Sequence, residues 1–273
     1  MCELLGISIS PAAKMGVYFK AFRPRAEENQ SGWGVGWYEQ GRARVIKEAS
    51  RADESAKALA LVDEHPTSDV FVVHVRKATV GDVSLENTHP FTRRVKRRDW
   101  LFAHNGTIDG LERLDVNGFV SRGDTDSEVA FHFLLTRLLR ASEAGSSGGN
   151  GRAPDEASEI LKAAKTLSED GKVNFLLTDG KTLYAYHDGH KSLHFLERSP
   201  AQPSQVRLAD DTDYVVDLAE TGIPGEHAVI VATVPLNEER WTRFEPGQFL
   251  TCRAGKVVNL LGPELGLPEH DRR

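Results

Sequence analysis

Short segments in which apolar and polar positions alternate, or in which β-branched residues run together, occur through most of the chain. Such segments, bounded by Gly, Pro, Asn or Asp, are typical of β-strands. Gln40 and Gly41 separate two of them and predict a hairpin turn. We predict strands over residues 2–10, 31–38, 43–48, 70–75, 100–104, 173–178, 182–187, 192–195, 227–234, 248–253 and 256–260.

Other segments have the three-to-four-residue spacing of helices, namely residues 53–64, 124–140 and 155–169. Residues 143–153, rich in Gly and Ser, predict a flexible loop between the last two helices. Residues 11–25 predict a short helix or an irregular segment. Because strands lie on both sides of the helical pair, we predict two sheets with helices packed outside them, in a single α+β domain over residues 1–273.

The composition of the 273-residue chain is that of a globular protein, with 40% hydrophobic and 27% charged residues. A net charge of −6 argues against nucleic acid as the main partner. No apolar run is long enough to span a bilayer, and the first residues lack the basic and apolar regions of a signal peptide. We therefore expect a soluble cytoplasmic protein without a membrane or nucleic-acid partner.

Cysteine and histidine usage gives no indication of a metal centre. Two cysteines, Cys2 and Cys252, are too few for a disulfide framework or a four-cysteine zinc site. His74, His89 and His104 are fifteen residues apart, which is not a metal-ligand spacing. We expect no metal and no other cofactor, and we interpret each histidine as a hydrogen-bonded residue of the core or of a site.

Cys2 stands at the beginning of the first predicted strand. If Met1 is removed, the thiol and a free α-amino group belong to the same residue. An α-amino group has a pKa of about 8, so it can act as a base close to neutral pH, where a thiol is already partly ionised. One residue can then supply both nucleophile and base. The alternative is that Cys2 is an ordinary small core residue.

Two further segments place hydrogen-bond donors at the ends of predicted strands. The side-chain amide of Asn105, beside the main-chain N–H of Gly106, can donate to a developing oxyanion, although Asn-Gly is also a common turn. Arg76 has the planar guanidinium that suits a carboxylate. Both segments are therefore candidates for a substrate site.

Residues 123–128 form an acidic segment at the start of the clearest helix. Asp124 is expected to cap the helix and Glu128 to be a first-turn acid, which leaves Asp126 as a spare carboxylate for an ammonium group. A calcium loop is rejected because its sixth position holds Val129 rather than Gly. The basic cluster over residues 93–98 is interpreted as a solvated hairpin tip.

Taken together, these residues resemble the class-II glutamine amidotransferases, which are N-terminal-nucleophile hydrolases, and in particular their small stand-alone members. The resemblance covers residues 2–128, and the rest of the chain matches only as a pattern of strands and helices. The segments that carry it occur in family order: Met-Cys-Glu-Leu-Leu-Gly6, Gly-Trp-Gly34, His-Val-Arg-Lys-Ala-Thr79, Glu-Asn-Thr-His-Pro-Phe91, Trp-Leu-Phe-Ala-His-Asn-Gly106 and Asp-Thr-Asp-Ser-Glu128.

The resemblance implies a four-layer αββα fold, with two mostly antiparallel sheets between helices. It implies that Cys2 attacks the side-chain amide of glutamine or of a γ-glutamyl compound, forms a thioester and releases ammonia or an amine. Asn105 and the N–H of Gly106 would form the oxyanion hole, and the α-amine of Cys2 would act as base through a water. The substrate-binding residues implied are Arg76 for the α-carboxylate, Asp126 for the α-ammonium, and Thr79 and His89 for the pocket wall.

No nucleotide or sugar-phosphate motif follows Glu128. The chain is then a glutaminase, a hydrolase of another γ-glutamyl compound, or a subunit that works with a separate acceptor (synthase) subunit. Two other functions stay open: an N-terminal-nucleophile acylase with a different amide substrate, and a catalytically silent binding or regulatory module. The pair Arg76 and Asp126 disfavours the acylase, because together they match an amino-acid head group.

Overall fold

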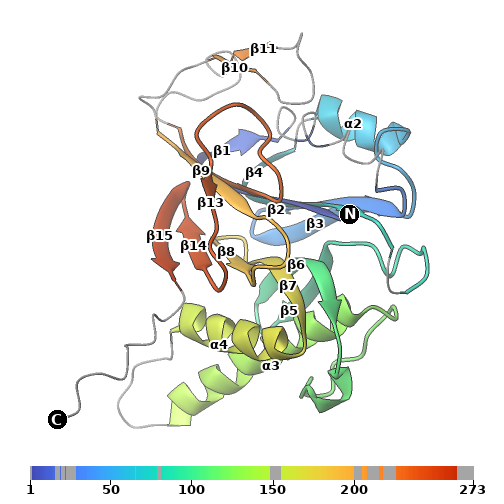
Figure 1. The fold of residues 1–273 in the computed structure, drawn as a ribbon, viewed down its shortest axis with the longest axis vertical. Helices are drawn as coiled ribbons and strands as arrows, with labels where there is room; N and C mark the ends of the chain where they lie inside the picture. The colour runs from blue at the N-terminus through green and yellow to red at the C-terminus, as the bar shows by residue number, and fades with distance from the viewer. Residues whose placement is uncertain are drawn as a thin grey trace, which may run out of the picture.

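The computed structural model describes residues 2–15, 19, 22, 29–64, 66–78, 81–147, 155–199, 205–207, 215–217 and 226–262. Within them two large sheets lie face to face between helices, so the molecule is the αββα sandwich that the sequence predicts (Figure 1). Helix α2 (Ala56–Glu64) covers one sheet, and α3 (Asp126–Ser147) and α4 (Glu156–Glu169) cover the other. No described helix is both long and apolar enough to cross a membrane.

The strands of both large sheets pair antiparallel with their neighbours. The first sheet has the order β13 (Thr242–Arg243), β9 (His194–Arg198), β12 (His227–Ala232), β1 (Glu3–Lys14), β4 (Thr67–Arg76), β2 (Gly32–Glu39) and β3 (Arg42–Glu48). The second has the order β15 (Lys256–Leu261), β14 (Phe249–Arg253), β8 (Thr182–His187), β7 (Gly171–Thr178), β6 (Arg98–Ile108) and β5 (Phe91–Val95). Strands β10 (Gln205–Arg207) and β11 (Val215–Asp217) form a separate pair, and Leu111–Arg113 form a short 3-10 helix, η2.

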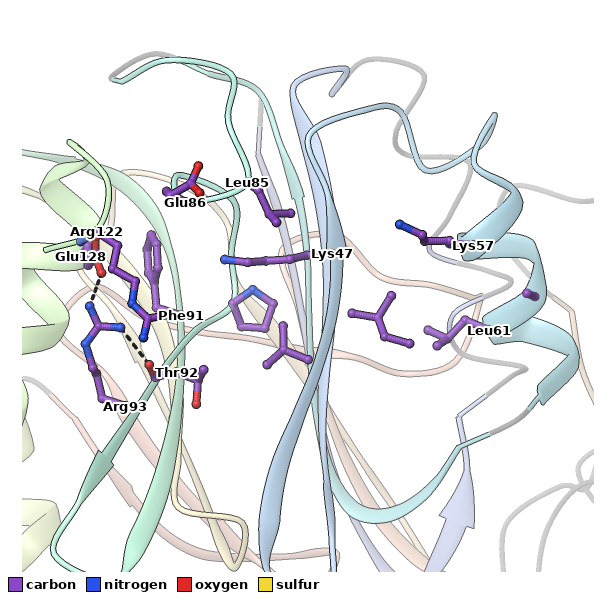
Figure 2. Close-up of a pocket in the computed structure, with 14 residues that line it drawn as sticks. Lys47, Lys57, Leu61, Leu85, Glu86, Phe91, Thr92, Arg93, Arg122 and Glu128 are labelled. Carbon is purple, nitrogen blue, oxygen red and sulfur yellow. Dashed lines mark hydrogen bonds and ion pairs between the residues drawn. The ribbon is translucent and has the colours of Figure 1, made fainter.

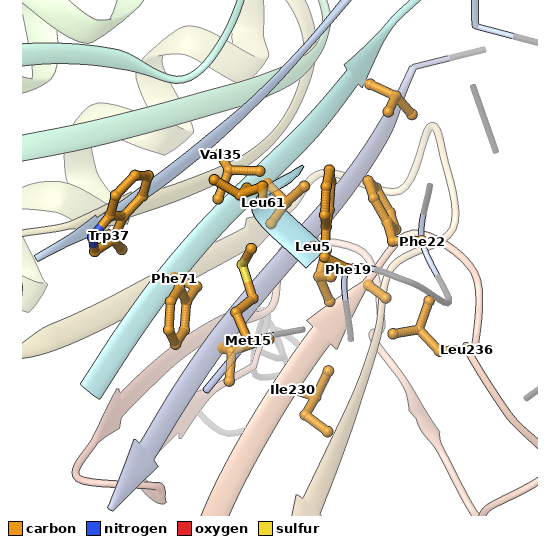
Figure 3. Packing of buried hydrophobic residues seen from close by; sticks show 14 of the residues in the cluster. Leu5, Met15, Phe19, Phe22, Val35, Trp37, Leu61, Phe71, Ile230 and Leu236 are labelled. Atoms are coloured by element: carbon orange, nitrogen blue, oxygen red, sulfur yellow. The ribbon is translucent and has the colours of Figure 1, made fainter. Parts of the chain in front are cut away.

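Alternation along the strands divides the core into three layers, because successive side chains of a strand point to opposite faces. In β1, Leu5 and Ile7 belong to the cluster on the helix-covered outer face of the first sheet. Figure 3 shows that cluster, in which Leu5 lies with Phe19 and Leu61. Leu4, on the opposite face of β1, belongs instead to the cluster between the two sheets. The third cluster lies between the second sheet and α3 and α4.

Three segments differ from the sequence prediction. Strand β1 continues past Ser10 to Lys14, and a register shift between Ser8 and Ala13 lets Pro11 lie in it without a ladder hydrogen bond to β4. Helix α3 begins at Asp126 rather than at residue 124 and runs to Ser147, so residues 143–147 of the predicted loop are helical. Residues 148–153 of that loop lie outside the described part of the chain.

Strand β6 also differs, because it runs through Asn105 and Gly106 to Ile108 rather than ending in an Asn-Gly turn. In the basic cluster over residues 93–98, the turn itself is Lys96 and Arg97, and the remaining residues belong to β5 and β6. The fold thus places the start of β1, the end of β4, the later part of β6 and the start of α3 at the same end of the sandwich, as the contacts described next show.

Candidate active site

Cys2 immediately precedes β1, and neighbouring groups hold both its thiol and its carbonyl. Its Sγ accepts a hydrogen bond from the main-chain N–H of Lys77 at 3.1 Å and lies 3.2 Å from the carbonyl oxygen of Lys77. Its own carbonyl oxygen accepts hydrogen bonds from Asn105 Nδ2, at 2.6 Å, and from Lys191 Nζ. Cys2 is partly exposed, whereas Cys252 is fully buried and burial raises the pKa of its thiol. Cys2 is therefore the accessible thiol of the two.

Asn105 and Gly106 are held by pairing of β6 with β7, where they face Asn174 and Val173. A Cβ at Gly106 would overlap the carbonyl oxygen of Lys172 on β7, so only glycine allows this approach of the two backbones. The amide of Asn105 is buried and directed at Cys2. Gly106 thus allows β6 and β7 to approach closely, and Asn105 donates a hydrogen bond to Cys2.

Arg76 and Asp126 lie at the same end of the sandwich, and main-chain groups orient both. The buried guanidinium of Arg76 donates to the carbonyls of Asp82, at 3.0 Å, and Gly81, at 3.3 Å. The carboxylate of Asp126 accepts from the N–H of Ile108 at 2.7 Å and from its own neighbour, the N–H of Ser127, at 2.9 Å. Burial lowers the pKa of Arg76, while the charges of Cys2, Asp124 and Asp126 oppose that shift, which shows that these groups are near one another.

The cap of α3 is Thr125 and not Asp124, which corrects the sequence prediction. Thr125 Oγ1 accepts the N–H of Glu128 at 3.4 Å. Asp124 is instead engaged with Asn87, whose Nδ2 donates to the carboxylate at 2.5 Å and whose Oδ1 accepts the N–H of Asp124 at 3.0 Å. Glu128 forms an ion pair with Arg93 across a buried contact. The start of α3 is therefore fixed to the segment that follows β4.

His89 packs between the sheets against His74 and Phe91, with ring centroids 4.3 Å and 4.5 Å apart. The ring nitrogens of His74 and His89 make no hydrogen bond to another described residue, contrary to our expectation, whereas His104 bonds to Ser127 and to the carbonyl of Lys172. Burial lowers the pKa of His74 to about 3 and that of His89 well below its usual range. Both rings are therefore neutral at pH 7. Thr79 lies outside the described residues.

Sequence reasoning missed a second group of residues beside Cys2. Lys191 Nζ lies 3.5 Å from a carboxylate oxygen of Glu3, and the other oxygen of Glu3 accepts from Thr233 Oγ1. The side chains of Lys191 and Glu3 are only 14% and 12% exposed, so the pair is largely shielded from water. Lys191 belongs to a loop without any motif, and no local signal could have indicated it. In the described part of the chain, no three His, Cys, Asp or Glu side chains are grouped as metal ligands would be.

A family model described as class-II glutamine amidotransferases matches residues 1–269. The chain is 33% identical over 268 residues to YafJ of Escherichia coli K12, which is named as a glutamine amidotransferase candidate. The match covers 94% of this chain and 100% of YafJ. The chain therefore belongs to the class-II glutamine amidotransferases.

Solved structures agree with this membership. The crystal structure of a predicted glutamine amidotransferase from Pseudomonas aeruginosa PA01 is similar with a TM-score of 0.67 at 26% identity, over 94% of this chain and 100% of that one. Glutamine phosphoribosylpyrophosphate amidotransferase from B. subtilis shares the fold, with a TM-score of 0.62 at 18% identity over 96% of this chain and 49% of its own.

Proposed function

We propose that this chain hydrolyses the γ-amide bond of glutamine or of another γ-glutamyl compound, with the Cys2 thiol as nucleophile. The observation that carries the proposal is the setting of Cys2. Its sulfur is held by the main chain of Lys77 at one end of the sandwich, the residue is partly exposed, and Asn105 Nδ2 donates to the carbonyl oxygen of the same cysteine. Arg76 and Asp126, a cation and an anion oriented by main-chain bonds, lie nearby.

In the proposed reaction, removal of Met1 exposes the α-amine of Cys2, which takes the thiol proton, through a water, as Sγ attacks the amide carbon. The proton then passes to the leaving nitrogen, and ammonia or an amine departs from a γ-glutamyl thioester. Water cleaves the thioester and releases glutamate and the thiol. The second hydrogen of Asn105 Nδ2 and the N–H of Gly106 would stabilise the oxyanion in both steps.

Recognition would depend on the amino-acid head group of the substrate. Arg76 offers a planar guanidinium and Asp126 a carboxylate, and main-chain groups orient both. Arg76 would bind the α-carboxylate and Asp126 the α-ammonium, with Thr79 and His89 in the pocket wall. Lys191 would position Cys2 through its carbonyl. Any acceptor of the ammonia would belong to a separate synthase subunit.

The test is release of glutamate from a panel of γ-glutamyl compounds, by protein whose intact mass shows that Met1 is absent. We expect hydrolysis of at least one compound with a free α-amine and little of its N-acetyl counterpart. Asp126→Asn should remove most of that discrimination. Equal hydrolysis of N-acetylglutamine and glutamine would favour the acylase, and no release from any compound would favour the silent module.

A further inference from the structure

A cavity of about 560 Å³ lies at the edge of the sandwich where β3 and β5, the last strands of their sheets, come close. Its volume is in the range of small-molecule sites. Neither Cys2 nor Asn105 lines this cavity, and its strand β3 is three strands away from β1, about 14 Å at the usual spacing. Figure 2 shows Lys47, Phe91 and Arg122 pointing toward one another on one side of β3, with Leu61 of α2 on the other.

Lys47 is a half-buried cation, and the two groups in direct contact with its ammonium are neutral. Its Nζ donates to the carbonyl of Thr88 at 2.6 Å and lies 5.5 Å from the ring centroid of Phe91. It forms no ion pair with a carboxylate of the described residues, and neither does the exposed guanidinium of Arg122. By contrast Arg93 and Lys57, which also line the cavity, are paired with Glu128 and Glu48.

An ammonium that is half-buried and has no described carboxylate within ion-pair distance has lost part of its hydration, and its carbonyl and ring contacts and the more distant charges of Glu128 and Glu86 return only part of it. An anion placed between Lys47 and Arg122 would supply the missing charge, and Leu85 and Phe91 would cover an apolar group attached to it. We propose that this cavity binds a small organic anion, with the anionic group at Lys47 and Arg122 and an apolar body against Phe91 and Leu85. The site goes beyond the proposed hydrolase reaction and does not depend on it.

The protonation of Lys47 gives the site a characteristic pH dependence. Burial lowers the pKa of Lys47 to about 8, so Lys47 loses its positive charge as the pH rises from 7 to 9. A bound anion favours the protonated form, so affinity should fall over the same interval. The charged or titratable groups that face Lys47 are Glu128, Glu86, Arg122, Arg93 and His89.

The test compares phenylacetate with phenylacetamide, its neutral counterpart of similar shape, by titration calorimetry on the full chain. We expect phenylacetate to bind at one site, at least about tenfold more tightly than the amide, as a charged hydrogen bond implies. Phenyl phosphate is titrated as a second anion. Excess glutamate, which is the product of the proposed reaction, should not displace either anion.

Variants then locate the site. Lys47→Met and Arg122→Gln should each weaken phenylacetate binding about tenfold, and Lys47→Arg should bind without the loss of affinity between pH 7 and 9. Arg44→Gln is the matched control, because Arg44 is on the same strand but does not line this cavity. Thermal unfolding of each variant checks the fold. Equal binding of acid and amide, failure of both anions to bind, or equal losses in Arg44→Gln and Lys47→Met would overturn the proposal.

Discussion

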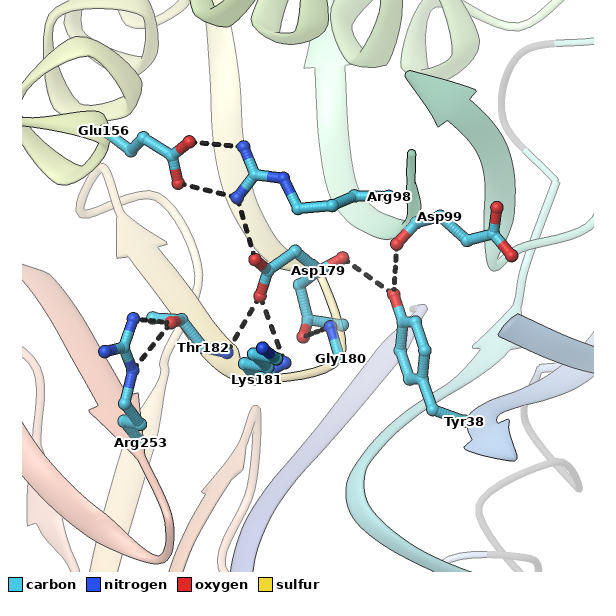
Figure 4. A network of polar contacts seen from close by, with 10 residues as sticks. Tyr38, Arg98, Asp99, Glu156, Asp179, Gly180, Lys181, Thr182 and Arg253 are labelled. Carbon is cyan, nitrogen blue, oxygen red and sulfur yellow. Dashed lines mark hydrogen bonds and ion pairs between the residues drawn. The ribbon is translucent and has the colours of Figure 1, made fainter. Parts of the chain in front are cut away.

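The two ends of the sandwich are both polar, but their polar groups are arranged differently. At the Cys2 end, Asn105 and Lys191 are directed at the main chain of a partly exposed cysteine. At the opposite end, the polar side chains satisfy one another and connect the two sheets with helix α4 (Figure 4). The first arrangement gathers hydrogen-bond donors around the proposed nucleophile, and the second uses polar side chains to join elements of the fold.

The opposite end is centred on Tyr38, whose hydroxyl lies 2.9 Å from the carbonyl of Asp99 and 3.0 Å from that of Thr178. Burial raises the pKa of Tyr38. Nearby, Asp179 accepts from Arg98 at 2.9 Å, and Arg98 also pairs with Glu156 at the start of α4. A hollow of about 1310 Å³, larger than the edge cavity, opens at this end. The larger hollow thus lies at the end whose polar groups bond one another, and not at the end where donors surround a partly exposed thiol.

Replacement of Cys2, the proposed nucleophile, should give the largest change in activity and so the sharpest contrast between the two ends. Cys2→Ala should reduce glutamate release below detection, since loss of a hydrolase nucleophile costs on the order of 10⁶ in kcat. A diazo-ketone analogue of glutamine should label Cys2 and leave the buried Cys252 unmodified. Mass spectrometry of the labelled peptide is the measurement. Labelling of Cys252 alone would mean that the Cys2 end is not the reactive one.

Asn105→Ala should give the next largest effect. It removes a donor that matters most as charge develops on the substrate oxygen, so kcat should fall by about 10²–10³ with little change in KM. Steady-state kinetics with glutamine measures both. A variant that keeps its turnover but loses affinity would place Asn105 in substrate binding rather than in the oxyanion hole.

Acid should destabilise the Cys2 end and not the Tyr38 end. His74 and His89 have a lower pKa in the folded chain than the usual 6.5, so the folded state binds fewer protons. Their contribution to stability is complete above about pH 6.5 and is lost progressively as the pH falls below it, by about 1.4 kcal/mol per pH unit for each ring. Urea unfolding between pH 7 and 5 measures the slope.

One variant makes that measurement specific. His89→Phe should lower the slope by the contribution of one ring. An unaltered slope in His89→Phe would show that other groups take up the protons.

Lys191→Met should lower kcat by roughly tenfold, because one charged donor to the Cys2 carbonyl is lost. The same change leaves Glu3 without its cation. Glu3→Gln/Lys191→Met therefore serves as the control, since it removes both charges. If the double variant recovers full turnover, Lys191 neutralises Glu3 and does not position Cys2.

Tyr38→Phe should have the smallest effect, and only on stability. The carbonyls of Asp99 and Thr178 share the single hydroxyl proton of Tyr38, and its loss should lower the free energy of unfolding by about 1–2 kcal/mol. Turnover of glutamine should stay within twofold of the parent protein. A large loss of kcat without a loss of stability would make the Tyr38 end functional and would undo the contrast.

The fold could be predicted where local periodicity decides it. In β1, Leu5 and Ile7 point to one face and Leu4 to the other, as alternation predicts. The same alternation in several strands predicts the layers of the core. The extension of β1 beyond Ser10 could not be predicted, because a register shift in its pairing with β4 accommodates Pro11, and that pairing is not visible in the local sequence.

The candidate site divides in the same way. Cys2, Arg76 and Asn105 stand in recognisable segments, and the structure brings them to one end of the sandwich, although their roles stay predictions. Lys191 is 189 residues from Cys2, and only the sheet topology brings the two together. Asp124 and Thr125 are both good capping residues. Thr125 caps the helix because the carboxylate of Asp124 is hydrogen-bonded to Asn87, which is 37 residues away in the sequence.

The position of β1 has a consequence for biosynthesis. Leu5 pairs with Val73 on one side and with Ala232 on the other, so the strand that follows the cysteine can be completed only when most of the chain has left the ribosome. At about 5–20 residues per second, that interval lasts on the order of ten seconds or more. During it the first residues are still outside the finished sheet, and a methionine aminopeptidase has time to reach Met1. The order of synthesis would thus leave Cys2, the proposed nucleophile, accessible to that enzyme before the strand beside it is buried.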